Sequence, residues 1–118
     1  EGKATAAAIR GELTSAVERM RENTGKSPGL AVVLVGERRD SATYVRMKKK
    51  ACDEIGVQSF GFDFPEDVTQ EELLKCVGEL NARDDIHGIL VQLPLPAHID
   101  EQVVLCSIMP SKDVDGLH

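Results

Sequence analysis

A tyrosine and a lysine stand four residues apart in the stretch Asp40–Lys48, which reads as the start of a helix. Because residues four apart lie on one face of a helix, we expect the phenol of Tyr44 and the amine of Lys48 to point the same way. An aromatic ring can stack on a flat ligand, and an amine can act on a reacting carbon and its water. A Tyr-x-x-x-Lys pair is also often a solvated helix edge, so by itself it does not establish a site.

Polar side chains in two other segments could join this pair. Gln92 ends a run of aliphatic residues, and Asp113 and Asp115 lie close together near the end of the sequence. At one rim of a sheet, an aromatic ring, an amine, an amide and a carboxylate would suit a flat, polar, partly anionic small molecule. In the alternative reading, Gln92 only satisfies backbone groups and the aspartates form an ordinary polar turn.

The elements that must position these residues alternate along the chain. Apolar residues at helical spacing predict helices over residues 3–24, 40–55, 69–83 and 100–108, and aliphatic or aromatic runs predict strands over residues 30–35, 57–64 and 87–93. This order predicts βαβ crossovers and a mostly parallel sheet with helices on both faces, which is a three-layer α/β domain. The loops after the first and third strands then leave the carboxyl edge, where open α/β sheets bind ligands.

Local signals refine this outline. Thr69 followed by Glu72 matches a capping box, which predicts that a helix begins there. Gly56 is the expected end of the helix that carries the tyrosine and the lysine. We expect the core-facing stripe of that helix to be Met47, Ala51 and Ile55, with the tyrosine and lysine at its edge.

Composition limits the classes of function. The 118 residues fit one domain, and a formal charge of −6 argues against a nucleic-acid-binding protein. The three cysteines are far apart, so they form neither a metal site nor a disulfide framework. No apolar run approaches the length of a membrane span. Because the sequence lacks an initiator Met, we expect a fragment, and a transit peptide could have been removed.

Three separated blocks of the sequence resemble the bifunctional methylenetetrahydrofolate dehydrogenase/methenyltetrahydrofolate cyclohydrolase family. The blocks are Val35-Gly36 through Ser41 with Tyr44-Val45-x-x-Lys48 and Ile55-Gly56, then His87-Gly88-Ile89-Leu90-Val91-Gln92-Leu93-Pro94-Leu95-Pro96, then Lys112-Asp113-Val114-Asp115-Gly116. The resemblance implies that residues 1–118 form the amino-terminal, folate-binding domain of such an enzyme. It also implies a carboxy-terminal Rossmann-like domain for NADP or NAD, of which the sequence shows no glycine-rich phosphate loop.

The resemblance further implies a role for individual residues. The implied catalytic residues are Lys48, Tyr44 and Gln92. Lys48 would be the central catalytic group, with Gln92 paired to it, and Tyr44 would stack on the aminobenzoate of the folate. Ser41 would have a supporting role beside the site.

For the pterin ring, the resemblance implies a second set of contacts. Asp115 would hold the ring through its amino group and ring N–H, and backbone groups near Val91 and Leu93 would complete the slot. The implied substrate-binding residues are Tyr44, Lys48, Val91, Gln92, Leu93 and Asp115.

The implied activity belongs to one-carbon folate metabolism. The substrate 5,10-methylenetetrahydrofolate would be oxidised with NADP or NAD to the methenyl cation, which water would convert to 10-formyltetrahydrofolate. An exposed lysine is protonated at neutral pH, so we expect hydrolysis to depend on a second domain closing over the cleft. The parent protein would be a homodimer that binds no nucleic acid or membrane. It would lie in the cytoplasm or, after transit-peptide removal, in a mitochondrion or plastid.

Two alternatives compete with this interpretation. A short-chain dehydrogenase also uses a tyrosine and a lysine four apart, but it has an upstream glycine-rich turn, whereas the first strand here leads into Gly36-Glu37-Arg38-Arg39. A non-enzymatic reading is a truncated α/β domain that binds folate or a partner without turnover.

Overall fold

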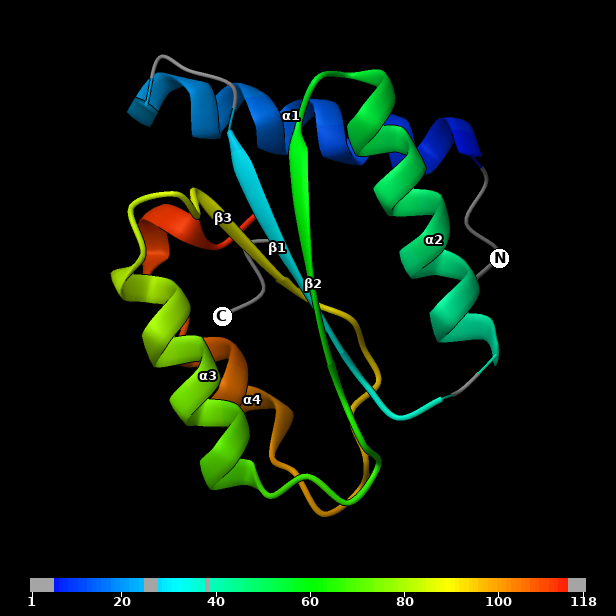
Figure 1. Cartoon of the computed structure of the whole chain (residues 1–118), viewed down its shortest axis with the longest axis vertical. Coiled ribbons are helices and arrows are strands. Elements are labelled where there is room, and N and C mark those ends of the chain that lie inside the picture. The colour runs from blue at the N-terminus through cyan, green and yellow to red at the C-terminus, as the bar shows by residue number, and fades with distance from the viewer. Residues whose placement is uncertain (1–5, 25–27, 38, 115–118) are drawn as a thin grey trace.

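Helices and strands alternate along the chain as the sequence predicts (Figure 1). The computed structural model describes residues 6–24, 28–37 and 39–114. The elements are α1 (Ala6–Thr24), β1 (Gly29–Val35), α2 (Arg39–Glu54), β2 (Gln58–Phe64), α3 (Gln70–Ala82), β3 (Gly88–Val91), α4 (Glu101–Cys106) and a 3-10 helix, η1 (Pro110–Lys112). The first residues of the predicted helix over 3–24 lie outside the described part.

The three strands form one parallel sheet in the order β2-β1-β3. Val32 in the middle of β1 lies opposite Gly61 in β2 and Leu90 in β3. Helices α1 and α2 lie on one side of the sheet, and α3 and α4 lie on the other (Figure 1). The predicted three-layer α/β architecture with a parallel sheet is therefore confirmed.

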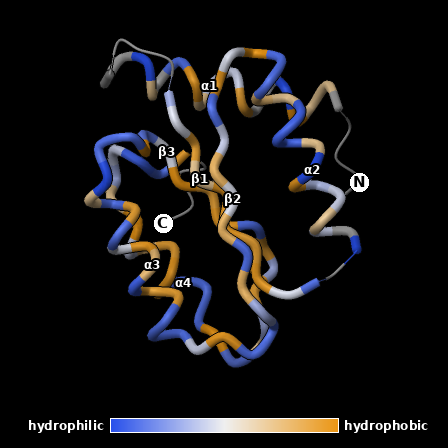
Figure 2. Tube along the Cα trace, viewed as in Figure 1, coloured by the Kyte–Doolittle hydropathy of each residue, from blue (hydrophilic) through white to orange (hydrophobic). Residues whose placement is uncertain are grey.

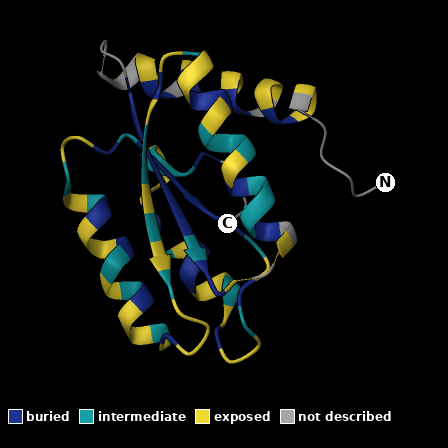
Figure 3. Cartoon of the chain, turned by 45° about the vertical axis from the view of Figure 1, so that its right-hand side comes forward, coloured by how far each residue is buried: buried dark blue, intermediate teal, exposed yellow. Residues whose placement is uncertain are grey.

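The central strand β1 is buried on both faces. Successive side chains of a strand point to opposite faces, so Ala31 and Val33 pack with α3 and α4, while Leu30 and Val32 pack with α1 and α2. This explains why the run is continuously aliphatic, and β1 and β3 form the apolar centre in Figure 2. The edge strand β2 has no buried residue (Figure 3).

The buried face of α2 differs from the expected one. Ala51 is buried as predicted, but Met47 and Ile55 are only half-buried, and Val45 and Cys52 lie deeper. The reason is that α2 packs against two neighbours, the sheet and α1. The line of positions 41, 45, 48 and 52 faces the sheet, and this line contains the predicted catalytic lysine rather than leaving it at an edge.

The predicted ends of two helices are confirmed. Gly56 has a φ of +81° just beyond α2, a left-handed conformation that glycine adopts without a steric penalty. The capping box of α3 is complete, because the Thr69 hydroxyl accepts from the Glu72 amide and the Glu72 carboxylate accepts from the Thr69 amide. These contacts fix where α2 stops and α3 starts.

The third strand is shorter than predicted. The strand was expected over residues 87–93, whereas β3 covers Gly88–Val91. At its start, the His87 backbone amide still donates to the Gly29 carbonyl at 2.8 Å, and the His87 Nδ1 atom accepts from the Gly29 amide at 3.0 Å. At its end the Gln92 amide still donates to the Val33 carbonyl at 2.9 Å, and a cis Leu93–Pro94 peptide follows. The sheet therefore guides the chain as far as Gln92.

Candidate functional site

A lysine and a glutamine from distant parts of the chain meet at the carboxyl edge of the sheet. The Lys48 Nζ atom donates a hydrogen bond to Gln92 Oε1 at 2.9 Å. The alternation of side chains along β3 explains the meeting, because Gln92 points to the same face as Leu90, which packs with α1 and α2. Lys48 comes from α2 on that face. The structure thus brings together two of the three residues for which catalytic roles were predicted.

Hydrogen bonds to described residues fix the position of the Gln92 side chain. It is only 8% exposed, its backbone amide is bonded to β1, and its Nε2 donates to the Leu93 carbonyl at 3.1 Å. Lysine has only donors, so the amide oxygen must face Lys48 and the amide nitrogen must face the carbonyl. The glutamine therefore holds the lysine amine at a defined point at the edge of the sheet. The alternative interpretation, in which Gln92 only satisfies backbone groups, is incomplete.

Tyr44 and Ser41 lie on the same helix as the lysine. Tyr44, one turn earlier, is half-buried and packs against the core between the sheet and α1 and α2. Ser41 is 4% exposed, so its hydroxyl is enclosed by the protein. Tyr44 therefore keeps part of its surface accessible, whereas Ser41 does not, and the roles expected for both residues stay predictions.

The residues predicted for the pterin slot are placed only in part. The Val91 side chain is 3% exposed and belongs to the core beneath α3 and α4, so only its backbone is at the edge of the sheet. The Leu93 carbonyl already accepts from the glutamine side chain. Asp115 lies outside the described residues. The nearest described neighbour on the sheet is Asp113, which forms a parallel bridge with Ile89 of β3.

Two of the described cysteines, Cys52 and Cys76, do not have the character of a nucleophile. Burial raises the pKa of the Cys52 thiol to about 11, and the charge of Asp53 adds to the shift. Burial, and then Glu79, also raise the pKa of Cys76. A raised pKa keeps a thiol protonated and unreactive at neutral pH. Among the described residues, no cluster of three or more His, Cys, Asp or Glu is arranged to hold a metal ion.

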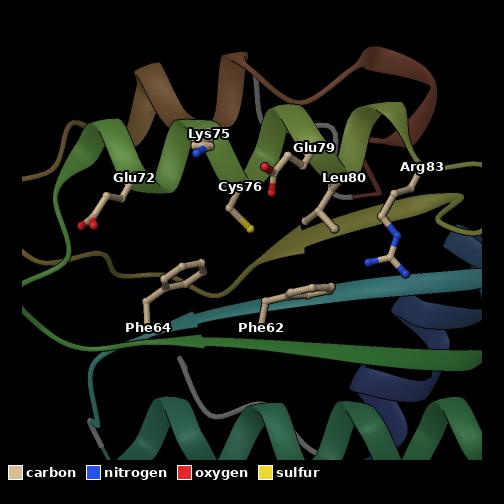
Figure 4. A pocket seen from close by; sticks show the side chains of 8 residues that line it. All are labelled: Phe62, Phe64, Glu72, Lys75, Cys76, Glu79, Leu80 and Arg83. Atoms are coloured by element: carbon tan, nitrogen blue, oxygen red, sulfur yellow. The ribbon is translucent and has the colours of Figure 1, made fainter.

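A groove on the opposite face of the sheet is a separate feature. Its volume is about 390 Å³, and it lies between β2 and α3, with Phe62 and Phe64 on the strand side and Cys76 on the helix side (Figure 4). The guanidinium of Arg83 lies 5.8 Å from the centre of the Phe62 ring at one end. None of the predicted site residues lines this groove, so we do not assign the chemistry to it.

These observations define the class of protein as a three-layer α/β domain with polar side chains from α2 and β3 at the carboxyl edge of a parallel sheet. Residues 1–115 match the family model described as tetrahydrofolate dehydrogenase/cyclohydrolase, catalytic domain. The chain belongs to this family, which confirms the resemblance seen in the three sequence blocks.

Individual relatives agree with this assignment. The chain is 57% identical over 118 residues to the bifunctional protein FolD 4, chloroplastic, of Arabidopsis thaliana, and covers 33% of it. It is 49% identical over the same length to the bifunctional protein FolD of Methanococcoides burtonii, and covers 41% of it. The chain thus spans about a third to two fifths of the length of these relatives.

Solved structures share the fold. The bifunctional FolD enzyme of Campylobacter jejuni superposes with a TM-score of 0.79 and 47% identity, covering 96% of this chain and 40% of that one. The Trypanosoma brucei methylenetetrahydrofolate dehydrogenase-cyclohydrolase, solved with NADP and an inhibitor, gives a TM-score of 0.74 and 45% identity, covering 96% of this chain and 38% of that one.

Among the described residues of the present chain, no helix is both long and apolar enough to cross a membrane.

Proposed function

We propose that this chain is the folate-binding part of a methylenetetrahydrofolate dehydrogenase/methenyltetrahydrofolate cyclohydrolase. The observation that carries the proposal is the bond between Lys48 Nζ and Gln92 Oε1, because it places an amine and an amide together at the ligand-binding edge of the sheet. The relatives with bifunctional FolD names support the same activity. In this proposal residues 1–118 form one domain, and a Rossmann-like domain elsewhere in the whole protein binds the nicotinamide cofactor.

The described residues do not fit a dinucleotide. The turn after β1 contains one glycine, Gly36, followed by the exposed acid Glu37, where a pyrophosphate needs several glycines and free backbone amides. We therefore assign to this chain the folate alone and derive no step through NADP or NAD. For the dehydrogenase reaction, its contribution is to hold the folate flat, with Tyr44 stacked on the aminobenzoate and Asp115 paired with the pterin.

For the hydrolysis reaction, the chain supplies a proton acceptor. Water forms a bond to the methenyl carbon and gives up one proton to the Lys48 amine. The bond between that carbon and the pterin nitrogen then breaks as the remaining hydroxyl proton passes to this nitrogen, which leaves the formyl group on N10. The Gln92 oxygen fixes the amine beside that carbon. The amine can accept a proton only in its neutral form, and closure of a second domain over the cationic substrate would favour that form.

Two finer features of the whole protein are also proposed. We infer a homodimer from the family resemblance, and sedimentation of the complete protein would test it. For the compartment, we propose the cytoplasm or, after removal of a transit peptide, an organelle. The chloroplastic name of one Arabidopsis relative supports the second choice.

The test replaces the amine without changing the helix. In the complete protein, Lys48→Met should lower the cyclohydrolase rate by about 100-fold or more, because positioned acid–base groups contribute factors of this size, while tetrahydrofolate still binds. Lys50→Met is the matched control, since Lys50 is an exposed lysine on the same helix. A wild-type hydrolysis rate in the Lys48 variant would refute the role of the lysine. Tetrahydrofolate binding without any turnover by the wild-type protein would favour the non-enzymatic alternative.

A further inference from the structure

An acid in the first turn of α4 reaches back to the loop that follows the lysine–glutamine pair. The Glu101 Oε2 atom accepts a hydrogen bond from the Leu95 backbone amide at 2.8 Å. Leu95 is only 8% exposed and Glu101 is half-buried, so the protein encloses both partners of this bond in part. The loop therefore has a fixed point shortly after it leaves the sheet at Gln92.

This loop offers few backbone donors by which it could be held. Proline has no N–H, so in the stretch from Pro94 to Pro96 only Leu95 can donate from its backbone. At the other end of the loop, the Gln92 amide donates to β1 at 2.9 Å. Among the described contacts, the chain between Gln92 and Leu95 is thus held by the sheet on one side and by the Glu101 carboxylate on the other.

The carbonyl that orients the glutamine side chain lies between these two anchors. The Leu93 carbonyl accepts from Gln92 Nε2 at 3.1 Å, and Gln92 Oε1 accepts from Lys48 Nζ at 2.9 Å. If that carbonyl turned away, the amide could rotate and present its nitrogen to the ammonium, and two donors would then face each other. The orientation of the lysine's partner therefore depends on how firmly the loop holds Leu93.

The cap of α4 does not account for the bond between the acid and the loop. Asp100 already caps this helix, because its side chain accepts from the amides of Gln102 and Val103. An acid in the first turn also favours a helix through the macrodipole, but this effect requires no contact with a loop. Glu71 in the first turn of α3 is an acid of this kind and is exposed. The bond to Leu95 is thus separate from the helix cap.

We propose that Glu101 is a positioning residue for the hydrolysis reaction: by holding the Leu95 amide, it keeps the Leu93 carbonyl where it orients Gln92 toward Lys48. The inference rests on the proposed function, in which the lysine accepts a proton from the attacking water. Glu101 acts through the loop and does not itself contact the substrate. Its loss therefore slows hydrolysis only as long as the glutamine is present.

A double-mutant cycle in the complete protein tests this proposal, with the hydrolysis of 5,10-methenyltetrahydrofolate as the measured reaction. Glu101→Ala and Gln92→Ala should each lower kcat by about tenfold or more, since a small displacement of a positioned group has an effect of at least this size. The double variant should be no slower than Gln92→Ala alone. Glu101→Gln keeps an acceptor oxygen and should retain most of the rate. Glu71→Ala is the matched control and should leave kcat unchanged.

A second readout needs no turnover. In the NMR spectrum of the complete protein, the side-chain amide protons of Gln92 should exchange with solvent faster in Glu101→Ala than in the wild type, because the bond to the Leu93 carbonyl is loosened. If Glu101→Ala does not fold, Glu101→Met, which has a similar length and no acceptor oxygen, enters both measurements. Equal exchange in the variant and the wild type would show that the acid does not hold the glutamine.

The outcomes separate the inference from the function beneath it. A slow Gln92→Ala, together with an unchanged rate for Glu101→Ala or with strictly additive effects, overturns the positioning role and leaves the lysine–glutamine pair intact. A wild-type rate for Gln92→Ala overturns the role of the glutamine and the inference with it. Absence of any hydrolysis by the wild-type protein overturns the proposed function itself.

Discussion

At the scale of single residues, the geometry of the site depends on hydrogen bonds that allow a side chain only one orientation. The side-chain amide of Gln92 is such a group, because its oxygen accepts from Lys48 Nζ and its nitrogen donates to the Leu93 carbonyl. The meeting of lysine and glutamine was predicted, since both follow from the periods of a helix and a strand. The contacts of Lys112 with the end of α3 were not predicted, because no local pattern reveals where that helix lies relative to the lysine.

The buried thiol of Cys52 gives a prediction about pH. Its pKa of about 11 in the folded protein lies above the ordinary value of 9.0, so the folded state keeps its proton in a range where the unfolded state loses it. The stability that comes from this shift is fully present below about pH 9 and is lost as the pH rises through about 11, a change of roughly 3 kcal/mol in total.

Urea unfolding at pH 8 and at pH 10.5 measures this loss. Cys52→Ala is the comparison, since it removes the thiol and leaves every other titrating group in place. The free energy of unfolding should fall more steeply between the two pH values in the wild-type protein than in the variant. Equal falls in both proteins would show that the thiol is not the protonated, buried group described here.

At the scale of elements, the sequence predicted which helices and strands exist, and in what order, better than it predicted which face of a helix is buried. The helices and strands appear in the predicted order, and the capping box predicted at Thr69 and Glu72 is formed at the start of α3. The buried face of α2 is rotated from the expected one, because two neighbours compete for it and periodicity does not say which is closer. The start of β3 also differs, because the His87 ring accepts from the Gly29 amide in a contact between distant segments that no local pattern reveals.

Two glycines give opposite predictions for element stability. Gly78 lies in α3 with nothing within 4 Å of an added Cβ, so Gly78→Ala should raise the free energy of unfolding by about 0.5–1 kcal/mol. Gly56 has a φ of +81°, where a Cβ is strained, so Gly56→Ala should lower it by about 1–2 kcal/mol. Denaturant titration of both variants measures the change in the free energy of unfolding. A change of the same sign in both would contradict either the helical environment of Gly78 or the left-handed conformation of Gly56.

At the scale of the whole molecule, the two faces of the sheet have different properties. The face under α1 and α2 carries the lysine–glutamine pair at its carboxyl edge, while the face under α3 carries the groove beside the edge strand (Figure 4). The position of the site followed from the rule for parallel sheets, and the family followed from three short blocks of sequence. The contact between Asp115 and a pterin stays a prediction, because Asp115 lies outside the described residues.

A structure of the complete protein with a bound folate analogue tests the central claim most directly. The account predicts that the analogue lies along the carboxyl edge of the sheet, with its aminobenzoate ring against Tyr44. The atoms around its reacting carbon should lie about 3 Å from Lys48 Nζ or the Gln92 side-chain amide. An analogue bound in the groove between β2 and α3, or one that leaves the lysine–glutamine bond untouched and facing solvent, would contradict it.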